Sequence, residues 1–329
     1  MDYPECINSS NLYTGNGTYA SNMCKIVGNK KLFSLVLDKK HNDYPGILMY
    51  PKKGSFLNRY VINGMFPKFV YGLENKFYHY LDPGIMPLSE EGIVTVHDLY
   101  SPENENFAIK KARELKINKY RKFQHIISIS ETTKKALIEH GFSEESIEVI
   151  HHGVPAGWKK YENVQEIREK FRLPQNRKIA ITVGDGHFKN NPLVTEALKN
   201  SDFVHVHVGT EAGEIKFNKI SIEDLNQIIC ASDVLIRVSS EEGFGFPPIQ
   251  AITVGIPIVV SKTPVFQELF ENSAFYADIS RESILESVKI AVKEKDEYIE
   301  KTNKYASYFG FDAFRKRMDN YYGKIELPL

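Results

Sequence analysis

The chain has 329 residues, 42% hydrophobic residues and equal numbers of basic and acidic side chains, 42 of each. This length exceeds what one core usually supports, so we expect two domains. The ordinary composition excludes a disordered or fibrous chain, no apolar run is long enough for a transmembrane helix, and the balanced charge gives no indication of a nucleic-acid partner.

The N-terminus, Met-Asp-Tyr-Pro-Glu, lacks the basic start and apolar core of a secretion signal. The three cysteines are widely spaced, suit a reducing compartment and form no metal or disulfide pattern. We therefore expect a cytoplasmic protein.

The first half of the chain predicts an alternation of strands and helices, followed by a polar connection over residues 155–177. Strands are expected at residues 33–37, 46–50, 92–96, 125–130 and 146–150, and helices at 19–27, 107–122 and 131–140. Basic residues gather in two stretches, 52–76 and 110–122. The first is interleaved with aromatic residues, and the second has seven basic residues against one glutamate.

The second half shows the same alternation more clearly. Strands are expected at 178–183, 203–208, 234–238 and 256–260, and helices at 191–199, 222–231 and 313–322. Short apolar strands alternating with helices predict a parallel sheet covered on both faces. Ligands of such sheets bind beyond the carboxyl ends of the strands.

Residues 239–261 are the most informative segment. The strand before them is followed by Glu241 and Glu242 and by a glycine-rich turn, Gly243-Phe244-Gly245; a helix is expected to open at Pro247-Pro248 and to end at Gly255. Free N–H groups at a helix start favour an anion, and the nearby carboxylates can hold hydroxyls. A sugar nucleotide carries both kinds of group.

This segment resembles the nucleotide-sugar signature of retaining glycosyltransferases of family 4, which have the GT-B fold. Glu242 takes the position of the first family glutamate, and Gln250 stands where the second is usual. In the family the second carboxylate accepts hydrogen bonds from the donor ribose. A glutamine keeps one acceptor but loses the charge, which predicts donor binding weaker by roughly 1 kcal/mol.

Further segments resemble the family in the same order. Residues 13–19 are similar to its early glycine loop, with Gly15 and Gly17; His97 ends an apolar strand where a family histidine faces the sugar; and His152-Gly153-Val154 is similar to a later motif. His151 and His152 are adjacent and lack metal-ligand spacing, so we expect no zinc site there.

Residues 183–191 resemble the family loop that holds the donor diphosphate. Lys189 supplies a compact cation, and Gly184, His187 and Asn190 are expected to bind the donor with it. Many family members carry arginine directly after the first glycine. Here that residue is Asp185, which exchanges a positive charge for a negative one beside the expected diphosphate.

The resemblance implies an α/β fold of two Rossmann-like domains whose parallel sheets face each other across a cleft. Residues 1–155 would form the acceptor-side domain, with a last helix over about 310–329 packing back on it, and 156–309 the nucleotide-sugar domain. Glu242, Lys189 and His97 would be the catalytic residues. Gly15, Gly17, Gly153, Gly184, His187, Asn190, Gly243, Phe244, Gly245 and Gln250 would bind substrate.

The implied activity is retaining transfer of a hexose from a UDP- or GDP-sugar to a glycan, lipid-linked or protein acceptor. No Asp-x-Asp pair occurs to hold a divalent metal, so we expect no metal and no cofactor besides the donor. Two alternatives stay open, a non-catalytic subunit that binds a sugar nucleotide or glycan, and a sugar-nucleotide epimerase of the same fold. The two basic stretches raise a further expectation, peripheral contact with an anionic membrane.

Overall fold

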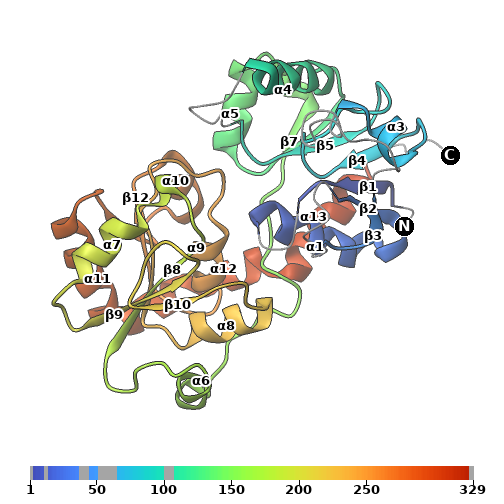
Figure 1. Cartoon of the computed structure of the whole chain (residues 1–329). Helices are drawn as coiled ribbons and strands as arrows, with labels where there is room; N and C mark the ends of the chain where they lie inside the picture. Colours follow the sequence, from blue (N-terminus) through green and yellow to red (C-terminus); the bar gives the residue numbers. More distant parts are fainter. Residues whose placement is uncertain (1–2, 11–13, 37–43, 51–64, 100–106, 326–329) are drawn as a thin grey trace. The chain divides into compact units, whose positions relative to one another are not determined.

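The computed structural model describes the chain apart from residues 1–2, 11–13, 37–43, 51–64, 100–106 and 326–329. The chain divides into two compact units (Figure 1). Unit 1 comprises Met1–Pro155 and Phe314–Leu329, and unit 2 comprises Ala156–Ala313. The basic and aromatic stretch expected to touch a membrane falls largely on residues 51–64, which lie outside the described residues.

Unit 1 contains a seven-stranded sheet in the order β3-β2-β1-β4-β5-β6-β7, and every described pairing in it is parallel. Its strands are β1 (Glu5–Asn8), β2 (Leu32–Leu35), β3 (Ile47–Met49), β4 (Tyr78–Tyr80), β5 (Ile93–Val96), β6 (His125–Ser128) and β7 (Ile147–Val149). Its helices are α1 (Gly15–Val27), α3 (Pro67–Tyr71), α4 (Phe107–Tyr120) and α5 (Glu131–Glu139), joined by most of α13 (Phe311–Tyr322).

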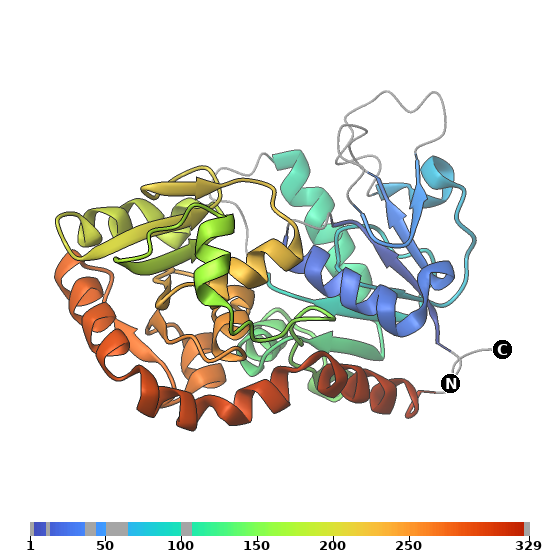
Figure 2. The ribbon, with the colours of Figure 1, turned by 90° about the horizontal axis from the view of Figure 1, so that it is seen from below.

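A buried polar network connects the sheet of unit 1 to the helices that cover it. His79 on β4 contacts the Tyr322 hydroxyl of α13 through Nδ1 at 2.6 Å and the Thr95 hydroxyl of β5 through Nε2 at 2.8 Å. Thr95 in turn lies 2.8 Å from the hydroxyl of Tyr19 on α1, the helix that crosses the strands in Figure 2. Burial lowers the pKa of His79 to about 3, so this histidine is neutral and serves packing.

Unit 2 contains a six-stranded parallel sheet in the order β10-β9-β8-β11-β12-β13. Its strands are β8 (Lys178–Val183), β9 (Phe203–Val208), β10 (Ile215–Phe217), β11 (Val234–Arg237), β12 (Ile258–Ser261) and β13 (Phe275–Ala277). Its helices are α6 (Val164–Lys170), α7 (Asn191–Leu198), α8 (Ile222–Cys230), α9 (Phe246–Ile252), α10 (Pro264–Phe270), α11 (Arg281–Lys293) and α12 (Lys295–Phe309).

The two parallel sheets with covering helices confirm the expected fold of two Rossmann-like domains. Each unit has its own apolar core, which includes Ile7, Tyr80 and Val94 in unit 1 and Ala180, Ile236 and Val259 in unit 2. In unit 2 the chain runs from β8 outward to β9 and β10 and then returns to β11 on the other side of β8. Such a reversal of strand order is where open parallel sheets bind ligands.

Candidate functional site

Three loops follow neighbouring strands of unit 2 and therefore meet at the carboxyl edge of its sheet. They are residues 184–190 after β8, 209–211 after β9 and 238–245 after β11. The amide of Ser240 donates to the carbonyl of Phe188 at 2.8 Å, and the Asn190 side chain donates to the carbonyl of Val238 at the same distance. The Gly186 amide donates to Glu211 at 2.8 Å. These bonds join the three loops into one site.

Lys189 lies in the first loop and is held close to the backbone of Gly184. A side chain at position 184 would place its Cβ 2.7 Å from the Lys189 ammonium nitrogen, and the backbone there has φ +83°. Only glycine accommodates both conditions without strain. Burial, followed by the positive charge of Arg237, lowers the pKa of Lys189 to about 8. Lys189, the residue predicted to bind the phosphate, is therefore a partly desolvated cation.

Glu242 lies in the third loop, close to the end of β11. Its carboxylate accepts a hydrogen bond from the Ser239 hydroxyl at 3.1 Å and forms an ion pair with Nε of Arg237 at 3.4 Å. The backbone carbonyl of Ser239 accepts from Ser261 on β12 at 2.6 Å, which fixes the strand end that carries Glu242. The glutamate thus lies on the same edge of the sheet as Lys189, as the sequence predicted.

Asp185, which stands where the family usually has arginine, is hydrogen-bonded through its carboxylate to residues of β9 and of the loop after it. Its carboxylate accepts from the Thr210 amide at 2.8 Å, from the Glu211 amide at 3.1 Å and from the Thr210 hydroxyl at 2.9 Å, and it lies 2.9 Å from Nε2 of His207. Partial burial alone would raise the pKa of Asp185, but these hydrogen bonds together lower it to about 2. Its negative charge therefore orders the 209–211 loop.

The remaining predicted donor residues of unit 2 differ in exposure. His187 is exposed and forms an edge contact with the ring of Phe188. Phe244 is buried against Phe309 and Phe246, so its side chain is part of the core. Gly243 is half-buried, and Gly245, with φ +87°, lies directly before α9. Gln250 is only 4% exposed, and its backbone carbonyl accepts from Trp158 at 3.0 Å.

In unit 1 the expected early glycine loop is instead the first turn of a helix. Gly15 and Gly17 belong to α1, because the Thr14 hydroxyl caps that helix by accepting from the Gly17 amide at 3.0 Å. The expectation of a loop before a helix at residue 19 was wrong in this respect. The cap overrides the low helix propensity of the two glycines.

His97 directly follows β5 and is 4% exposed. Its Nε2 lies 2.8 Å from the carbonyl of Leu81, and its Nδ1 lies 3.2 Å from Nε2 of His152. A carbonyl only accepts, so Nε2 of His97 carries the proton. Burial lowers the pKa of His97, and the ring is neutral. The ring centroids of His152 and Tyr19 lie 4.4 Å apart with the planes tilted by 40°, and the carbonyl of Gly153 accepts from the Asn22 side chain at 3.1 Å. The role of His97 toward the sugar stays a prediction.

Arg237 is a functional candidate that the sequence analysis missed. It is the last residue of β11 and only 5% exposed. Burial lowers its pKa, and Glu242 acts in the opposite direction. A signal was present in the sequence: an arginine ends an otherwise apolar strand, Val-Leu-Ile-Arg-Val over 234–238, and buried charges are rare unless they have partners or function.

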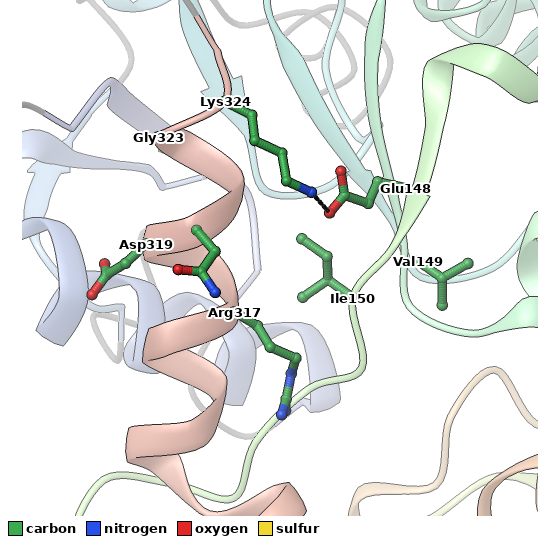
Figure 3. A pocket seen from close by; sticks show the side chains of 8 residues that line it. Glu148, Val149, Ile150, Arg317, Asp319, Gly323 and Lys324 are labelled. Carbon is green, nitrogen blue, oxygen red and sulfur yellow. Dashed lines mark hydrogen bonds and ion pairs between the residues drawn. The ribbon is translucent and has the colours of Figure 1, made fainter.

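A separate cavity of about 540 Å³ lies in unit 1 between β7 and α13 (Figure 3). Lys324 and Glu148 form an ion pair at 2.8 Å at its rim. It is lined by Glu148, Val149, Ile150, Arg317, Asp319, Asn320, Gly323 and Lys324. No residue proposed above for donor binding lines it.

The described helices include none that is long and apolar enough to cross a membrane. Within the same residues, no cluster of three or more histidine, cysteine or acidic side chains is placed to hold a metal ion.

Two family models match the chain. The model for Glycosyltransferase Family 4 matches residues 91–157, which include His97 and Gly153. The model for Glycosyl transferases group 1 matches residues 214–308, which include Arg237, Glu242 and Gln250.

Curated relatives and solved structures are similar to this chain over different lengths. The O-antigen chain mannosyltransferase RfbU of Salmonella typhimurium is 23% identical over 261 residues, 72% of this chain and 70% of that protein. The O-antigen biosynthesis glycosyltransferase WclY of Escherichia coli is 38% identical over 53 residues, 16% of this chain and 15% of that protein. The structure of Anabaena Alr3699/HepE in complex with UDP and glucose has a TM-score of 0.76 at 14% identity and covers 97% of this chain and 99% of its own. The structure of WaaG, a glycosyltransferase involved in lipopolysaccharide biosynthesis, has a TM-score of 0.70 at 12% identity, over 96% of this chain and 98% of its own.

Proposed function

The chain is a glycosyltransferase of family 4 with the GT-B fold, and from that premise we propose that it transfers a hexose from a UDP- or GDP-sugar to a glycan acceptor with retention of configuration and without a metal ion. The observation that supports the donor class is the arrangement of Lys189 and Glu242 on one edge of the unit 2 sheet, at the reversal of strand order. A cation and a carboxylate suit the two ends of a sugar diphosphate.

The roles follow from the charges of these side chains. Lys189 binds the diphosphate and stabilises the negative charge that grows on it as the sugar departs. Glu242 accepts hydrogen bonds from sugar hydroxyls. Lys189 offsets part of the charge of the diphosphate, which supports leaving-group stabilisation without a divalent cation.

The proposed acceptor is a growing glycan linked to a lipid. RfbU is an O-antigen chain mannosyltransferase and WclY an O-antigen biosynthesis glycosyltransferase, which supports a glycan acceptor for this chain as well. Helix α4 contains most of the basic stretch 110–122 and carries Phe107, which is 80% exposed, and Leu115, which is 44% exposed. Exposed apolar groups among lysines suit docking to an anionic membrane.

A panel of UDP-, GDP- and ADP-sugars, tested by thermal shift and then by transfer to oligosaccharide and lipid-linked acceptors, examines this proposal. We expect stabilisation by one nucleotide class, transfer in the presence of EDTA, and a product with the anomeric configuration of the donor by NMR. Donor binding without transfer to any acceptor would favour a non-catalytic binding subunit, and release of an epimerised nucleotide sugar would favour an epimerase. Sedimentation with anionic but not neutral vesicles tests the membrane contact.

A further inference from the structure

Arg237 is a buried cation, and two of its three guanidinium nitrogens have no hydrogen-bond partner among the described residues. Its ion pair with Glu242, at 3.4 Å, lacks hydrogen-bond geometry, and among the described residues neither Nε nor Nη1 has a hydrogen-bond partner. Arginine stays charged in proteins, and burying a charge is costly unless it is paired and hydrogen-bonded. A side chain that is 5% exposed and incompletely bonded is suited to bind an anionic ligand.

Charged side chains of both signs lie around Arg237 and Lys189. Lys189 is itself positive and cannot compensate Arg237, whose charge lowers the pKa of Lys189. Glu242 is the carboxylate that pairs with Arg237. The two other acidic groups near Lys189 are engaged elsewhere, since Asp185 accepts from the amides of residues 210 and 211 and Glu211 accepts from the Gly186 amide. Of these three carboxylates, Glu242 is therefore the one that pairs with Arg237, and Nε of that arginine still has no hydrogen-bond partner among the described residues.

We propose that Arg237 binds the diphosphate of the donor together with Lys189, and so supplies from β11 the positive charge that family relatives carry after the first glycine of the β8 loop, where this chain has Asp185. The inference rests on the proposed function for the identity of the donor. A planar guanidinium can donate two hydrogen bonds to phosphate oxygens, and Glu242 positions it through Nε. Because the guanidinium is largely desolvated, its interaction with the departing diphosphate is stronger than at an exposed site.

The test compares Arg237→Met and Arg237→Lys with Arg177→Met. Arg177 directly precedes β8, lies at the opposite edge of the same sheet and is paired with Glu214 at 3.5 Å, so its variant loses the same charge far from the site. Calorimetry would measure binding of UDP, GDP, inorganic pyrophosphate and the two parent nucleosides, and circular dichroism would report folding.

We expect Arg237→Met to weaken binding of the preferred diphosphate about 10- to 100-fold, the value of one or two charged hydrogen bonds, and to leave nucleoside binding unchanged. Arg237→Lys keeps the charge without the planar fork and should fall between this variant and the wild type. Arg177→Met should match the wild type. If Arg237→Met does not fold, a full diphosphate affinity of Arg237→Lys would still contradict a bidentate contact.

Diphosphate affinity of a folded Arg237→Met within twofold of the wild type would overturn the inference, as would an equal loss for nucleoside and diphosphate. The two proposals fail separately. A wild-type protein that binds pyrophosphate through Arg237 but neither UDP nor GDP would remove the proposed donor class and retain the role of Arg237.

Discussion

Raising the pH from 7 to 9 should weaken donor binding, because Lys189 then loses its proton. Its ammonium group is partly buried and is influenced by Arg237, Glu242, Asp185 and Glu211. Burial and the charge of Arg237 lower its pKa to about 8, whereas the three carboxylates act in the opposite direction. A lysine at the surface would keep its charge throughout this pH range.

The size of the effect follows from this pKa. At a value of about 8, roughly nine-tenths of Lys189 is charged at pH 7 and about one-tenth at pH 9. If the charged form alone holds the diphosphate, the apparent dissociation constant of the donor rises about tenfold, or about 1.4 kcal/mol.

Folding stability responds to the same rise in pH with the opposite sign. Between about pH 8 and 10.5 the unfolded chain binds more protons at Lys189 than the folded one, so this group's contribution to the free energy of unfolding increases with pH.

Calorimetry with a UDP- or GDP-sugar at four pH values between 7 and 9 measures the effect, since the diphosphate of a sugar nucleotide does not titrate there. Lys189→Arg is the matched control because arginine stays charged, and it also corrects for ionisation of the base. Because this variant has no lysine at position 189, we expect its donor affinity to change with pH only through ionisation of the base. A wild-type affinity that is constant up to pH 9, or an equal loss in Lys189→Arg, would refute the reasoning.

Other predictions address the neighbouring residues. Glu242→Ala should reduce transfer at least 100-fold, since the sugar loses a charged hydrogen-bond acceptor, while circular dichroism stays unchanged; a folded variant with near wild-type rate contradicts the assignment. Asp185→Ala should lower the free energy of unfolding by about 1 kcal/mol, because the 209–211 loop loses its acceptor. In the wild type the folded pKa of Asp185 is about 2, so its contribution to the free energy of unfolding is present above about pH 4 and lost as the pH falls toward 2. Melting temperatures measured at decreasing pH, with the variant as control, test this. Gly184→Ala should displace the Lys189 ammonium and cost about 1–2 kcal/mol of stability through the positive φ, so unchanged donor affinity would argue against the close contact. Transfer should continue in EDTA, and complete loss that Mn²⁺ restores would show that a metal is required.

The sequence predicted four of the six strands of unit 2 because they are continuous apolar runs, but it predicted none of α10, β13, α11 and α12, which follow β12. The boundaries of β8 and β9 agree with the prediction, and β11 and β12 differ from it by one or two residues. Four strands escaped the sequence analysis, namely β1, β4, β10 and β13. They have three or four residues, and β4 reads Tyr-His-Tyr. Nothing local marks such a segment as a strand; it is one because its backbone pairs with β1 and β5, which come from other parts of the chain.

The sequence by itself also identified Lys189 and Glu242, because both lie in local patterns in which glycines, acidic residues and a lysine have a recognisable order. It could not decide what Asp185 does. Read locally, that aspartate puts a negative charge beside the diphosphate; in the structure its charge is held by the amides of residues 210 and 211, which follow another strand. That Arg237 is buried with unbonded guanidinium nitrogens likewise depends on packing. Whether a charged side chain is paired and hydrated or buried with unused donors is determined by atoms distant in the sequence, and only the tertiary structure brings those atoms together.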